Sequence, residues 1–159
     1  MRIRFSLLAA ASLFLVSCGS ESKPTAAPQP IQKPEAPTPP DESRRFPQQN
    51  LVDTKIVKDH LLGKTFMPGG TLAHYHKGKL DYEMFITKLA TPTDAAILLP
   101  DWRKALTDVK PEPAFGGLFG SDAGRPVFVF TKGAWIVGIA GLSEKAADLQ
   151  GRELASRVN

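Results

Sequence analysis

The side chains best suited to chemistry are two histidines separated by a single residue. His74 and His76 lie in a segment where polar and apolar residues alternate. Because alternate residues of a β-strand point to the same side, both imidazoles would project together. Asp81 and Glu83 follow shortly after, and two imidazoles with a carboxylate suit Zn²⁺ or a similar divalent ion. We therefore take these four residues as candidate metal ligands.

Residues 72–87 must form a β-hairpin if these side chains are to meet. Gly78-Lys79 would be its two-residue turn, with glycine at the first central position. The same pairs can equally be exposed cross-strand charge pairs, which add little to stability. Both interpretations rest on one register, which pairs His74 with Glu83, Tyr75 with Tyr82 and His76 with Asp81.

Three helices are predicted around the hairpins. Residues 53–62 carry apolar side chains at helical spacing, which predicts a short first helix. A second helix begins after Thr91, an N-cap residue that is followed by proline at the first helical position. The third has Ser143 as its N-cap and runs through Val158, with small and apolar residues in one narrow stripe.

A second hairpin is predicted over residues 127–140, with its turn around Lys132-Gly133. Both faces of this hairpin are apolar, so it belongs at the centre of a sheet or presents an apolar face to a partner. Aromatic residues anchor many interfaces. The alternative is that other parts of the chain, or a second copy, cover them. The candidate binding residues are Phe85, Phe128, Phe130 and Trp135.

Residues 108–124 contain prolines and several glycines and are predicted to be a long irregular loop. The loop leads into a strand, whereas phosphate-binding loops lead into a helix, so we expect a structural loop. Ser121 lacks the G-x-S-x-G context of a hydrolase nucleophile. We predict no catalytic residue, no cofactor and no enzymatic activity.

The element order predicts an α+β fold. Residues 50–159 would form one small domain with a four-stranded antiparallel sheet of two hairpins and helices on one face. Its ββαββα core would be preceded by the short first helix. About 110 residues are enough for one core of this kind.

Cys18 is the single cysteine of the chain and follows a characteristic sequence. Arg2 and Arg4 precede an apolar run from Phe5 to Val16, which is too short to cross a bilayer. With Leu15-Val16-Ser17 before the cysteine, the segment resembles the lipobox of bacterial lipoprotein signal peptides. An ordinary secretory signal would more often end in an A-x-A-like site.

The lipobox resemblance implies lipidation of Cys18, cleavage after residue 17 and attachment to a membrane by several acyl chains, which anchor far more firmly than one. Gly19 stands where an inner-membrane retention signal would often have aspartate. The resemblance therefore favours the outer membrane, facing the periplasm, over the inner membrane.

Residues 18–49 are rich in proline and nearly devoid of large apolar side chains, which predicts a disordered linker. It would serve either as a spacer that lifts the domain off the membrane or as a passive connection. Without residues 1–17, 18 basic residues face 16 acidic ones, a net charge of +2. Basic residues do not cluster, so we do not expect a nucleic-acid partner.

Together these features predict a lipid-anchored envelope protein with a non-catalytic domain that binds another protein or peptidoglycan. The alternative function is a divalent-metal-binding protein or metal-dependent enzyme that uses the His74 and His76 strand.

Overall fold

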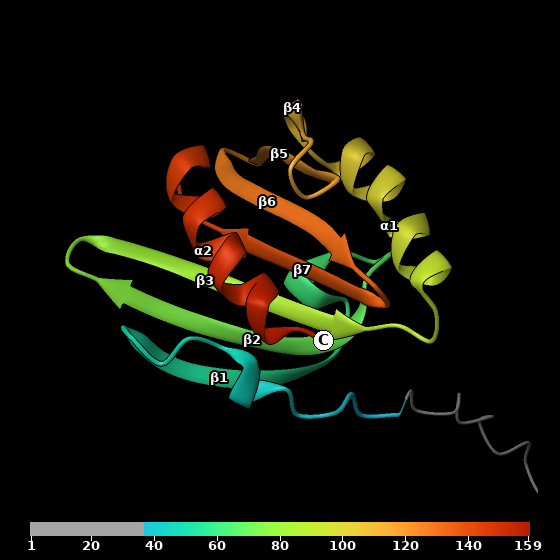
Figure 1. Cartoon of the computed structure of the whole chain (residues 1–159), viewed down its shortest axis with the longest axis horizontal. Coiled ribbons are helices and arrows are strands. Elements are labelled where there is room, and N and C mark those ends of the chain that lie inside the picture. Colours follow the sequence, from blue (N-terminus) through green and yellow to red (C-terminus); the bar gives the residue numbers. More distant parts are fainter. Residues whose placement is uncertain (1–36) are drawn as a thin grey trace, which may run out of the picture. The chain divides into compact units, whose positions relative to one another are not determined.

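The computed structural model describes residues 37–159, which build one antiparallel sheet of seven strands with helices against it (Figure 1). Across the sheet the strands follow the order β1-β2-β3-β7-β6-β5-β4. The strands are β1 (Leu51–Asp59), β2 (Pro68–Lys77), β3 (Leu80–Lys88), β4 (Thr107–Glu112), β5 (Gly117–Asp122), β6 (Arg125–Lys132) and β7 (Trp135–Ala140). The helices are α1 (Pro92–Ala105) and α2 (Glu144–Arg157), and the short 3₁₀ turns are η1 (Ser43–Arg45) and η2 (Leu61–Gly63).

The predicted four-stranded sheet is wrong because two segments expected outside the sheet are strands. The predicted helix over 53–62 is largely β1, an edge strand that pairs along β2. Its outward residues are exposed, so it lacks the strict polar and apolar alternation that identifies a half-buried strand.

The predicted loop over 108–124 is largely the hairpin of β4 and β5. The positions of its glycines and prolines are compatible with strands. Pro111 lies on the edge strand, where a missing N–H is tolerated. A side chain at Gly117 would collide with the Val129 carbonyl of the neighbouring strand.

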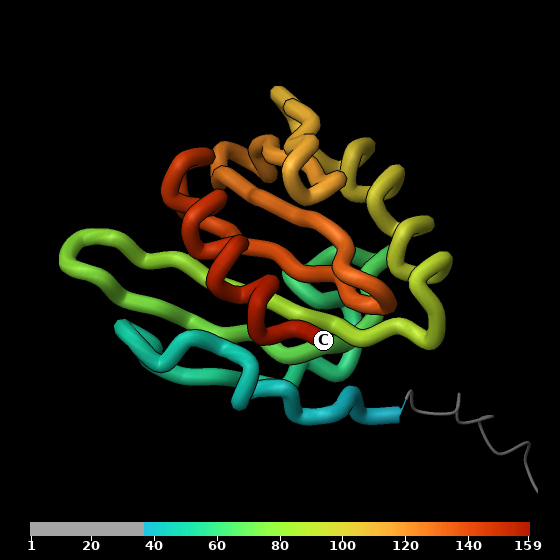
Figure 2. Tube along the Cα trace, in the orientation of Figure 1, coloured from blue at the N-terminus to red at the C-terminus, as the bar shows by residue number. Residues whose placement is uncertain are grey.

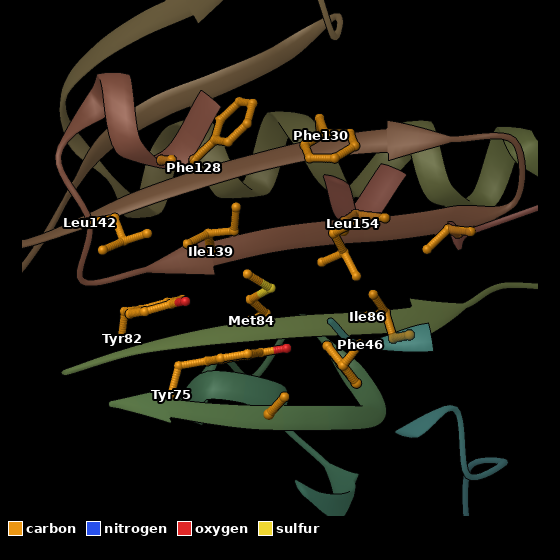
Figure 3. Packing of buried hydrophobic residues seen from close by; sticks show 14 of the residues in the cluster. Phe46, Tyr75, Tyr82, Met84, Ile86, Phe128, Phe130, Ile139, Leu142 and Leu154 are labelled. Carbon is orange, nitrogen blue, oxygen red and sulfur yellow. The ribbon is translucent and has the colours of Figure 1, made fainter. Parts of the chain in front are cut away.

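The two helices cover opposite faces of the sheet, so the prediction of helices on one face is also wrong. Residues of α2 pack with one set of strand side chains, which includes Met84 and Phe128, and we call this the α2 layer (Figure 3). Residues of α1 pack with the alternate set, which includes Phe85 and Val129, and we call this the α1 layer. Because β3 and β7 are buried on both sides, the sheet separates two apolar layers.

The structure confirms the predicted central position of the second hairpin and the predicted division of its side chains between the two faces of the sheet. β7 is the middle strand of seven, and every residue in it is buried. Phe128 and Phe130 lie in the α2 layer, whereas Val127 and Val129 lie in the α1 layer. The turn differs slightly from the prediction: Lys132 pairs with Trp135, so the two turn residues are 133 and 134.

Both long helices begin where the sequence predicts. Thr91 accepts a hydrogen bond from the Asp94 N–H while the Asp94 carboxylate accepts one from the Thr91 N–H, a reciprocal capping box. Ser143 is the N-cap of α2. The narrow stripe of Ala147, Gly151 and Leu154 is buried against the sheet.

The folded part of the chain starts before the predicted boundary between residues 49 and 50. Phe46 is fully buried in the α2 layer. The Tyr75 hydroxyl donates a hydrogen bond to the Pro47 carbonyl at 2.9 Å, and the Glu42 N–H donates one to Thr71 Oγ1. The predicted signal peptide, Cys18 and the first part of the predicted linker lie outside the described residues.

Candidate functional site

The predicted hairpin of β2 and β3 brings the histidines and acidic residues together in the expected register. His74 pairs with Glu83, and His76 pairs with Asp81. His76 Nδ1 lies 2.8 Å from Asp81 Oδ1, and His74 Nε2 lies 3.7 Å from the same oxygen. The hydrogen bond with His76 holds the pKa of the Asp81 carboxyl below its usual value.

The fourth candidate ligand points to a different partner. Glu83 Oε2 accepts an ion-paired hydrogen bond of 2.8 Å from Arg125, which comes from β6. Within residues 37–159, no group of three or more His, Cys, Asp or Glu side chains is arranged to hold a metal ion. His76 and Asp81 form an exposed cross-strand pair, whereas Glu83 is half-buried and pairs with Arg125.

The four aromatic residues singled out as binding candidates are all buried. Phe128, Phe130 and Trp135 belong to the α2 layer, whereas Phe85 belongs to the α1 layer on the other side of the sheet. Trp135 is further covered by the Arg45 guanidinium, 4.6 Å from the ring centre. Of the two alternatives, the exposed aromatic patch is wrong and cover by other parts of the chain is confirmed, because the helices, together with the segment before β1, occupy both faces.

The hairpin of β2 and β3 projects beyond the neighbouring strands (Figure 2). An apolar groove lies between this hairpin and α2. It has a volume of about 230 Å³. Tyr82 and Leu142 are nearly fully buried at this end of the layer and form its floor (Figure 3). We call this site the hairpin groove; residues lining it include Lys77, Leu80, Tyr82, Leu142, Ala146 and Leu149.

Two exposed leucines face each other across the hairpin groove. Leu80 begins β3 and is 52% exposed, and Leu149 lies on α2 and is 60% exposed. Lys77, opposite Leu80 on β2, lines the groove, and Lys79 lies in the adjacent turn. Neither lysine forms an ion pair with another side chain described in the structure.

Sequence reasoning missed this groove, although each wall carried a signal. Alternation placed Leu80 on the apolar side of the hairpin, but Leu80 lies in the part of β3 that extends past its pairing with β7, which starts at Glu83, and it is 52% exposed. Leu149 is the leucine of α2 that lies outside the buried stripe. Only the packing of α2 beside the hairpin brings the two leucines together.

Comparison with known proteins identifies no family: no family model, curated protein or solved structure matches this chain. In residues 37–159 neither helix combines the length and apolar character needed to cross a bilayer.

Proposed function

We propose that the protein is a lipid-anchored, non-catalytic binding protein of the bacterial envelope that holds a partner protein in its hairpin groove. The lipobox that ends at Cys18 supports the anchor and a periplasm-facing position at the outer membrane. The hairpin groove carries the binding part of the proposal, because it joins exposed leucines to a buried apolar floor.

The size of the groove favours a side chain over a free small molecule. Its volume of about 230 Å³ lies below the range of roughly 300–1,000 Å³ typical of pockets for drug-sized ligands. One large apolar side chain of a partner would fill it. Burying such a side chain contributes about 1.5–3 kcal/mol.

The positive charge at the end of the groove favours a partner with acidic residues next to the inserted apolar side chain. Lys77 and Lys79 would attract a carboxylate placed next to the inserted residue. The partner segment therefore combines one large apolar residue with neighbouring acidic residues. Membrane attachment would strengthen the apparent affinity of such a modest contact by raising the effective concentration of the two proteins.

Matched peptides test the groove. Short peptides with one central leucine, flanked by aspartates or by lysines, are titrated into the isotopically labelled protein while NMR shifts are recorded. The aspartate peptide should shift the methyl signals of Leu80, Leu142 and Leu149, more strongly at low salt than at high salt, and the lysine peptide should shift them less.

Leu149→Ser should abolish these shifts. Ile97→Ser is the matched control, because Ile97 is also 60% exposed but lies on α1, across the sheet. Equal shifts with both peptides, or loss in both variants, would contradict the proposed recognition. A second assay sediments the protein together with purified peptidoglycan. If the protein co-sediments and Leu149→Ser abolishes this binding, the groove binds the cell wall instead of a partner protein.

The anchor is tested separately. Cells that express the full chain are grown with an alkyne-labelled palmitate analogue, and the protein is fractionated. The protein should carry the label and stay with membranes, whereas Cys18→Ala should lose both properties. Label that persists in Cys18→Ala would place the lipid elsewhere and overturn the anchor.

A further inference from the structure

The two edges of the sheet differ in how they are protected. β4 is six residues long, contains Pro111 and has an irregular register, and such features prevent pairing with another chain. β1, the opposite edge strand (Figure 1), is nine residues long and pairs regularly with β2 from Asp53 onward, after one irregularity between Leu51 and Asp53. Two aliphatic side chains of β1 are exposed, Val52 at 59% and Ile56 at 41%. An edge of this kind can accept a further strand.

The backbone groups of β1 that face away from β2 can be assigned. The His76 N–H donates a hydrogen bond to the Asn50 carbonyl. Because backbone groups alternate in direction along β2, its residue His74 also faces β1, where it pairs with Asp53. The same alternation leaves the N–H and C=O groups of Thr54 and Ile56 directed outward.

One antiparallel register makes β1 complementary to itself. With Thr54 opposite Thr54 of a second copy, Asp53 lies opposite Lys55 of that copy, and this contact occurs twice because of the two-fold symmetry. Val52 lies in the irregularity between Leu51 and Asp53, so the regular pairing begins at Asp53. Opposite charges are thus matched on both sides of the two-fold axis.

Neighbouring registers bring like charges together. Centring the pair on Lys55 places two lysines opposite each other, and centring it on Asp53 does the same for two aspartates. Centring it on Ile56 places Asp53 opposite Asp59 of the second copy. Like charges directly opposite each other are destabilising, which disfavours these three registers relative to the one centred on Thr54.

We propose that the protein self-associates through β1, with two antiparallel copies of this strand related by a two-fold axis at Thr54. The sheet then continues from one copy into the other. This inference rests on the edge strand and not on the hairpin groove, so it stands or falls independently of the proposed function.

Cysteine cross-linking tests the register. The full chain carries Cys18→Ser and is purified in mild detergent, so an introduced cysteine is the only thiol. Thr54→Cys should form a disulfide-linked dimer under mild oxidation, because paired Cα atoms lie about 5.5 Å apart. Ile56→Cys should not, because the two copies of residue 56 lie four residues apart, roughly 13 Å.

Charge reversal tests the contacts without oxidation. Asp53→Lys and Lys55→Asp should each weaken the dimer about tenfold at low salt, as measured by sedimentation equilibrium, and the double variant should restore it. Thermal melting checks that each variant folds. A monomer at all accessible concentrations, a cross-link at residue 56 in place of 54, or no rescue by the double variant would overturn the proposal.

Discussion

Phe46 offers the sharpest test of where the folded domain begins, because the sequence places it in the predicted linker. Its side chain is fully buried against the α2 layer. An aromatic residue buries about 150–250 Å², and at about 25 cal/mol per Å² this area corresponds to about 4–6 kcal/mol. We expect Phe46→Ala to lower the free energy of unfolding by about 3–5 kcal/mol, within the range of buried aromatic truncations.

The assay is reversible urea unfolding followed by tryptophan fluorescence, together with thermal melting. The melting temperature should fall by about 10–20 °C for a domain of this size. Arg44→Ala is the control, because Arg44 is exposed in the same segment and its removal should change stability by less than about 0.5 kcal/mol. A Phe46→Ala variant as stable as Arg44→Ala would show that the segment before β1 does not belong to the core.

Three further predictions follow from other contacts. Trp135→Ala should lower the unfolding free energy by about 3–5 kcal/mol in the same urea assay; a change below 1 kcal/mol would mean that this ring is not core. Gly138→Ala should destabilise the protein because the added methyl group meets the Phe85 ring, and Phe85→Leu should recover part of the loss in a double-mutant cycle. His76→Ala should raise the pKa of Asp81 in an NMR titration of its carboxyl carbon, since their hydrogen bond lowers that pKa. A lowered carboxyl pKa stabilises the fold above the unfolded-state pKa, and this contribution is lost as the pH falls through the folded-state pKa; an unchanged Asp81 titration would contradict the assigned contact.

Local patterns predicted part of the fold correctly. The register of β2 with β3 followed from a two-residue turn, which alone fixes which residues face each other. The start of α1 followed from Thr91 and Asp94, whose capping contacts span only three residues. The central place of β7 followed from its apolar character on both sides.

The candidate site was predicted less well. The pairs of His74 with Glu83 and of His76 with Asp81 were correct as geometry. The ion pair of Glu83 was not predictable, because its partner Arg125 comes from β6, which lies far away in the sequence. The aromatic candidates failed because burial of Trp135 depends on α2 and on the segment before β1.

The sequence by itself determined the contacts between residues that are close together in the chain: the register of the hairpin of β2 and β3 and the N-caps of the two helices. Only the tertiary structure decided that β1 and the hairpin of β4 and β5 complete the sheet and that the helices lie on opposite faces. Edge strands have few buried side chains and draw their stability from pairing with a distant neighbour. The hairpin groove is of the same kind, because Leu80 and Leu149 meet only when α2 packs beside the projecting hairpin.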